Sequence, residues 1–141
     1  MAVRDNVTLN NILLAFEGNI ATNTTTTGAI IDTANQDMGV SFWIGATAYT
    51  DGTYKLILEE GDDSGLSDAT TVPAEKLIEV SGLDAVTTGV TAITADGDKY
   101  FKVGVFSTKR FVRPSVVSTS TSTGAQISVL ALVSPEILEA N

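Results

Sequence analysis

Hydrophobic and polar residues alternate along much of the chain with the period of two that is typical of β-strands. In residues 40–47, Val40, Phe42 and Ile44 fall on one face, whereas Trp43 falls on the other. The same alternation predicts strands over residues 54–59 and 125–133. Weaker patterns predict a short element near residues 12–16 and a strand at 28–33. Residues 89–133 hold four predicted strands, of which 125–133 is the last, and turns at 96–98, 107–108 and 120–124 separate them.

Turn residues and charges predict where these elements end. Asp51 and Gly52 form a strong hairpin signal, so we expect the strands on either side of them to pair. Continued alternation would place Glu60 in the core, where an unpaired charge is costly, so we expect that strand to end there. Pro73 stands at a plausible first helical position, and the stretch that follows it is long enough for one or two helical turns.

The N-terminal part contains a threonine run at residues 23–27, which we interpret as an ordered loop or an edge strand rather than as disorder. We therefore divide the chain into an N-terminal segment, a β-sandwich core and a short acidic tail. The N-terminal segment is an arm or an edge strand, packed on its own subunit or swapped onto a neighbour. The three parts are residues 1–27, 28–135 and 136–141.

Seven or eight strands, most of them joined without room for a crossover helix, predict an all-β chain with at most one short helix. An antiparallel β-sandwich or barrel fits this pattern. The strand at 125–133 is apolar on both faces, so we expect it to be central or covered. The length of 141 residues is that of a single domain.

Composition narrows the function. The chain has no cysteine and no histidine, which removes thiolate chemistry, the commonest general base and the commonest metal ligand. We therefore expect neither an enzyme nor a cofactor. The net charge of −9 argues against nucleic acid as a partner. Five of the eight basic residues lie within residues 99–113, which contain no acid, and this predicts internal pairing or contact with something acidic.

The acidic stretch EEGDDSGLSDATTVP, residues 59–73, allows three interpretations. The spacing fails the EF-hand register, but Asp62, Asp63 and Asp68 would suit an irregular calcium site. The same aspartates would also suit a solvated loop that they shape by bonding to its backbone. The third interpretation is an acidic patch that meets arginines of a partner.

The basic stretch, residues 99–113, leaves alternatives open as well. Its apolar residues form part of a core with solvated lysines between them, or Lys109, Arg110 and Arg113 contact another protein. Interleaved aromatic residues are also found in proteins that bind single-stranded nucleic acid. Three aromatic residues fall opposite the clearer core faces, which indicates strands buried on both sides or a subunit interface: Trp43, Tyr49 and Phe106.

Two long segments resemble the small jelly-roll cement (decoration) proteins of tailed-phage capsids. They are GAIIDTANQDMGVSFWIGATAYTDGTYKLILEEGDDSGLSDATTVP and KRFVRPSVVSTSTSTGAQISVLALV. In that family an Ile-Asp pair, here Ile31 and Asp32, ends an early strand before a long strand and a polar loop. An aromatic-hydrophobic-arginine strand, here at residues 111–113, then leads through a turn at 118–124 into a last apolar strand at 125–133.

This resemblance implies a jelly roll that binds the outer capsid surface as a homo-oligomer, a dimer or a trimer, and clamps neighbouring major capsid subunits. It implies no catalysis, nucleic acid or membrane, and it implies a protein made in the host cytoplasm and located in the virion. Together with the aromatic and basic residues above, it predicts a protein interface that includes Trp43, Lys109, Arg110 and Arg113. The alternative is a small β-sandwich that binds carbohydrate or calcium.

Overall fold

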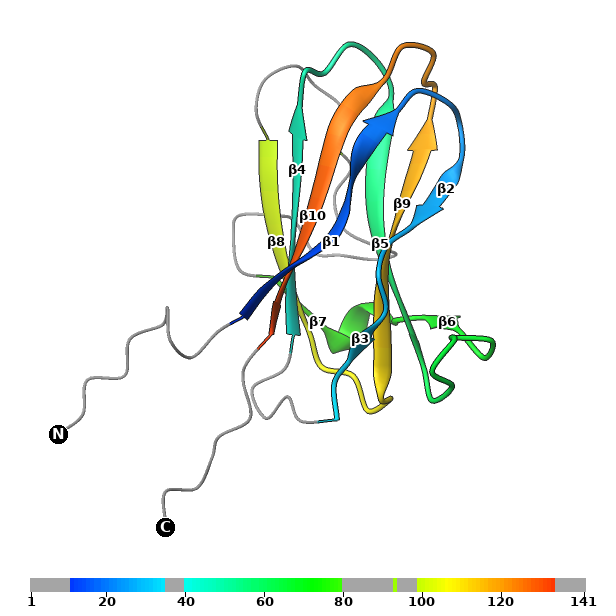
Figure 1. Ribbon diagram of the computed structural model, residues 1–141, viewed down its shortest axis with the longest axis vertical. Coiled ribbons are helices and arrows are strands. Elements are labelled where there is room, and N and C mark those ends of the chain that lie inside the picture. The colour runs from blue at the N-terminus through cyan, green and yellow to red at the C-terminus, as the bar shows by residue number, and fades with distance from the viewer. Residues whose placement is uncertain (1–10, 35–39, 80–92, 94–98, 134–141) are drawn as a thin grey trace, which may run out of the picture.

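The computed structural model describes residues 11–34, 40–79, 93 and 99–133 (Figure 1). Its strands form two antiparallel sheets that pack against each other, which confirms the predicted all-β sandwich. Sheet A contains, in spatial order, β1 (Asn11–Ile20), β10 (Ala125–Val133), β4 (Val40–Thr47), β8 (Lys99–Val105) and β7 (Leu77–Glu79). Sheet B contains, in spatial order, β2 (Thr25–Thr27), β9 (Phe111–Thr119), β5 (Thr53–Gly61) and β6 (Thr70–Thr71), and β3 (Ile31–Asp32) also pairs with β9.

The strand order is that of a jelly roll. The chain crosses between the sheets from β4 to β5, from β8 to β9 and again from β9 to β10, so that most sheet neighbours are distant in sequence. With β2 and β3 counted as one strand and the short β7 set aside, the orders are 1-8-3-6 in sheet A and 2-7-4-5 in sheet B. The longest ladders are β1–β10 at one edge of sheet A and β5–β9 in the middle of sheet B.

The core lies between the two sheets and follows the predicted alternation. Strand β10 buries every second residue. It pairs with β1 on one side and with β4 on the other, so it is an inner strand, as expected from its composition. Strand β5 does the same in sheet B. Several large side chains of the core are fully buried: Phe42, Ile44, Tyr54, Leu56 and Ile127.

The predicted pairing across Asp51 and Gly52 is wrong. Strand β4 belongs to sheet A and β5 to sheet B, so the connection at residues 48–52 crosses from one sheet to the other. Gly52 does adopt a positive φ of 97°, as the turn signal indicates. The signal predicts a local reversal, but the partner of each strand is chosen by burial of its apolar face rather than by the turn.

Strand β5 ends at Gly61, one residue beyond the predicted end at Glu60, but the expectation that Glu60 stays out of the core is wrong. The side chain of Glu60 enters the interior but is paired there, as described below. After Pro73 the chain makes one 3-10 turn, η1 (Ala74–Lys76), and then enters β7. The segment expected to hold at most one or two helical turns is this single turn.

The N-terminal segment contributes strands to both sheets. Strand β1 runs well beyond the predicted 12–16 and forms an edge of sheet A, while β2 lies within the threonine run and pairs with β9. Of the strand predicted at 28–33, only β3 is formed. The predicted strand before residue 96 lies largely outside the described residues, apart from Ile93, which bridges to Tyr54. Residues 1–10 and 134–141 are outside the described part as well.

Candidate functional site

The acidic loop at residues 61–69 joins β5 to β6, and its carboxylates bond to its own backbone. Asp68 accepts the amides of Asp62 and Asp63 at 2.8 and 3.2 Å. Asp63 accepts the amides of Gly65 and Ser67 at 3.0 and 3.1 Å, and these bonds hold the pKa of Asp63 below its ordinary value. This geometry corresponds to the interpretation in which the aspartates shape a solvated turn.

A cation would have to compete with these backbone donors for the same oxygens. Within the described part of the chain, no group of three acidic side chains is arranged to hold a metal ion. The remaining carboxylate of the predicted calcium set, Asp62, instead accepts a hydrogen bond from Lys109 at 2.5 Å. The structure thus gives all three predicted ligands another role.

The basic residues of the predicted interface pair with acids of the same chain. Arg110 binds Asp32 through two guanidinium nitrogens, at 2.9 and 3.1 Å, which lowers the pKa of that carboxyl. Arg113 on β9 donates to Glu59 on the neighbouring β5 at 2.9 Å. Together with Lys109 and Asp62, these pairs tie the start of β9 to the strands and loops around it. They are exposed or half-exposed and stabilise the fold only modestly.

Glu60 is the buried charge that the sequence analysis had placed outside the core. Its residue surface is 3% exposed, and Lys76 donates to one carboxylate oxygen at 2.6 Å. The hydroxyl of Ser107 donates to the other oxygen at 2.5 Å. The carboxylate therefore joins β5, the turn η1 and the connection between β8 and β9. Lys76 and Ser107 lie 16 and 47 residues away along the chain, so local patterns gave no signal of this cluster.

The part of the outer face of sheet A that β1, β4 and β10 form is apolar and carries little charge. Strands β1, β4 and β10, of 10, 8 and 9 residues, contain a single charged residue, Glu17. The large apolar side chains that point out of this face form a contiguous patch, because their strands are neighbours and their residues pair in register. We call it the sheet A patch, and it consists of Ile12, Leu14, Trp43, Leu130 and Leu132.

The patch is exposed at its centre and at its edge. Ile12 is 67% exposed, Leu14 is 56% exposed and Trp43 is 42% exposed. On the flank formed by β8, the ammonium of Lys102 lies 5.1 Å from the centre of the Trp43 ring. Large contiguous apolar patches on small proteins mark contact sites.

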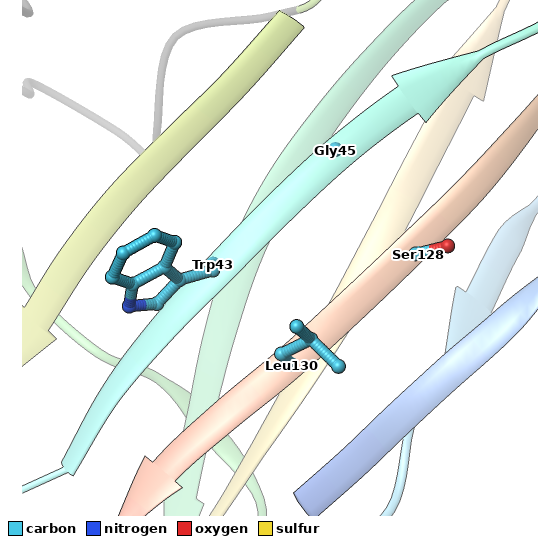
Figure 2. A pocket seen from close by; sticks show the side chains of 4 residues that line it. All are labelled: Trp43, Gly45, Ser128 and Leu130. Atoms are coloured by element: carbon cyan, nitrogen blue, oxygen red, sulfur yellow. The ribbon is translucent and has the colours of Figure 1, made fainter. Parts of the chain in front are cut away.

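Trp43 stands between two shallow hollows of this face. One hollow, of about 130 Å³, is lined by Ile12, Leu130 and Leu132 together with Trp43. The other hollow, of about 240 Å³, lies where the small residues Gly45 and Ser128 pair with each other, next to the pair of Trp43 and Leu130 (Figure 2). Figure 2 shows the indole ring of Trp43 leaning away from Gly45 and Ser128, so the second hollow is open beside it.

The predicted interface residues do not form one surface. Trp43 points out of sheet A, whereas Arg113 pairs with Glu59 on sheet B and Lys109 and Arg110 lie in the connection before β9. Of the two other aromatic candidates, Phe106 is 65% exposed in that connection. Tyr49 packs against the core, with its ring edge-on to Tyr54.

Comparisons with protein-family models, with curated proteins and with solved structures found no match. Among the described residues, no helix is both long and apolar enough to cross a membrane.

Proposed function

We propose that the chain is a structural capsid cement (decoration) protein. It binds the outer surface of a tailed-phage capsid as a homo-oligomer and holds neighbouring major capsid subunits together. The observation that carries this proposal is the sheet A patch, an apolar and nearly uncharged face on a chain whose net charge is −9. A surface of this composition favours stable contact with another protein chain, a second copy included, so it supports the homo-oligomer on which the proposal depends.

The way in which the chain uses its charged groups also supports a structural role. Lys76, Lys109, Arg110 and Arg113 each pair with an acid of the same chain. Asp63 and Asp68 hold the acidic loop in shape. These charged side chains thus fasten strands and loops of the same chain to one another. A scaffold of this kind suits a clip that is loaded mechanically by the DNA inside a capsid and that acts without catalysis or a cofactor.

An oligomer strengthens such a clip by multivalency. When one copy has bound a capsid subunit, the second copy meets the neighbouring subunit at an effective concentration on the order of millimolar. Individually weak contacts then become a persistent bridge. The acidic charge keeps the free protein soluble until it meets its binding surface.

The proposal is tested with mature capsids of the phage that encodes the chain, prepared from a strain that lacks its gene. Purified protein is mixed with these capsids and the mixture is sedimented. We expect saturable co-sedimentation at a fixed number of copies per capsid, and none with capsids of an unrelated phage. Protein that stays in the supernatant at all concentrations would contradict the proposal.

The alternative function, a module that binds calcium or carbohydrate, gains no support from a specific contact. Its predicted ligands Asp62, Asp63 and Asp68 accept hydrogen bonds from Lys109 and from loop amides.

A further inference from the structure

We infer that the sheet A patch is a two-fold interface between two copies of this chain. This deepens the homo-oligomer part of the proposed function and depends on that proposal for its biological role, although the interface itself forms without a capsid. Three of the six large hydrophobic residues exposed in the described part of the chain belong to this patch: Ile12, Leu14 and Trp43.

Charge identifies a second copy as the occupant. Two copies that each carry a net charge of −9 repel each other, and the repulsion is smallest where their contacting surfaces carry no charge. The patch comes closest to that surface, because Glu17, which pairs with Ser128, is the only charged residue of β1, β4 and β10, and Lys102 of β8 flanks Trp43. By contrast, the four ion pairs described above link acids of β3, β5 and the loop after β5 to bases of η1, β9 and the connection before β9. Docking through sheet A therefore keeps these charges out of the contact.

The patch carries two features that a two-fold contact can match, an exposed aromatic side chain and a hollow beside it. Trp43 is a projection, and the hollow over Gly45 and Ser128 lies beside it on the same two strands (Figure 2). A two-fold axis that passes between the projection and the hollow places each indole ring in the hollow of the other copy. An isologous interface requires this relationship, because both copies contribute the same surface.

The face, rather than the free edge of β1, is the surface available for this contact. A β-bulge between Leu14 and Phe16 interrupts the ladder of β1, and the carbonyl of Ala15 already accepts the amide of Ala29 at 2.8 Å. Bulges and covered carbonyl groups of this kind hinder strand-to-strand pairing at an edge.

The face is small for a stable dimer. The three strands that carry the patch, at a spacing of ~4.8 Å and each about eight residues long at ~3.3 Å per residue, give a face of roughly 380 Å² in projection. Stable dimers bury on the order of 800 Å² per partner. We therefore expect a dimer of modest affinity, with a dissociation constant on the order of micromolar.

The full-length chain allows a direct readout, because Trp43 is its only tryptophan. Mass by sedimentation equilibrium and Trp43 emission are followed over a range of protein concentrations without capsids. We expect the mass to rise from 14.7 kDa towards twice that value. Over the same range, the emission should shift to shorter wavelength and acrylamide should quench it less. Wild-type protein that stays monomeric throughout would overturn the interface and would indicate that another protein or the chain's own terminal residues occupy the patch.

Three variants separate this interface from general hydrophobic adhesion. Trp43→Ser removes the projection, and we expect dimerisation to weaken at least ~10-fold. Ser128→Leu fills the hollow; it should weaken dimerisation although it adds apolar surface, whereas simple adhesion would strengthen it. Phe106→Ser removes an exposed aromatic residue outside the patch and serves as the matched control with unchanged dimerisation. A thermal melt of each variant checks that it is folded.

Each remaining outcome decides the question as well. Dimerisation that survives Trp43→Ser, or that becomes stronger in Ser128→Leu, would overturn the interface. A monomeric chain that still co-sediments with capsids would overturn the interface and leave capsid binding intact. A dimer that does not bind capsids would leave the interface intact and contradict the proposed function.

Discussion

The backbone amide of Gly124 donates a hydrogen bond of 2.7 Å to a carboxylate oxygen of Asp51. The two residues lie in different connections, because Asp51 follows β4 and Gly124 precedes β10. The same carboxylate accepts the amides of Ser122 and Thr123 and the hydroxyl of Ser122. A single side chain thus fastens together two of the connections that carry the chain from one sheet to the other.

This contact predicts a dependence of stability on pH. The hydroxyl of Ser122 and the amide of Gly124 lower the pKa of Asp51 from its ordinary value of 3.8 to about 2. Because the folded-state pKa is the lower one, the stabilisation is fully present above about pH 4 and is lost as the pH falls towards 2. In Asp51→Asn, we expect a lower free energy of unfolding at pH 7 and a weaker loss of it between pH 4 and pH 2. Urea unfolding across this range measures both, and an unchanged acid profile would contradict the role of Asp51.

Gly124 itself is predicted to be intolerant of substitution. Its φ is 97°, and a Cβ placed on it would lie 2.3 Å from the carbonyl oxygen of Ile20. We expect Gly124→Ala to cost about 2 kcal/mol or more of unfolding free energy, because backbone strain and a clash with backbone coincide. Gly65→Ala is the matched control, since only the flexible side chain of Asp63 lies near, at 3.2 Å. Equal midpoints of denaturation for the two variants would contradict this explanation.

The buried pair of Glu60 and Lys76 predicts non-additive substitutions. Lys76→Met leaves the buried carboxylate of Glu60 without its cation, so we expect a loss of about 3 kcal/mol, whereas Glu60→Leu leaves a partly exposed ammonium and should cost less. The double variant Glu60→Leu with Lys76→Met should recover part of this loss, because it removes both charges. A double-mutant cycle in urea measures the coupling, and additive effects would show that the pair does not act as a unit.

The acidic loop is predicted to be insensitive to calcium. Its carboxylates accept amides of the same loop, and a ligand that binds only the native state would raise the melting midpoint. We expect the same midpoint in millimolar calcium as in a chelator, with magnesium as the ionic control. A rise specific to calcium would restore the alternative function as a calcium-binding module.

Much of the fold could be predicted where burial alone determines the structure. The last strand was predicted at residues 125–133, and β10 has these bounds, because every second residue from Ala125 onward is apolar and buried. The pairing of strands was less predictable. The Asp51-Gly52 signal marks a true turn, yet the turn joins two sheets, and bonds from Asp51 to residues 71 to 73 positions away hold it in place.

The partners of the buried Glu60 could not be predicted from the sequence either. The rule that an unpaired charge avoids the core is correct, but Glu60 is paired, and its partners Lys76 and Ser107 come from distant parts of the chain. The sequence did carry a signal for the sheet A patch. Trp43 fell opposite a core face, and the strand at 125–133 was apolar on both sides. These two features do not define the patch by themselves. Ile12 and Leu14 complete it, and they lie beside Leu132 and Leu130 because β1 pairs with β10.

The temperature at which DNA-filled capsids release their genome tests the proposed function most directly. Capsids that lack the chain are heated with a DNA-binding dye, with and without the purified protein. The account predicts that wild-type protein raises the release temperature by several degrees and that monomeric Trp43→Ser raises it less. An identical release temperature with and without wild-type protein, at concentrations that saturate the capsid, would contradict a cementing function.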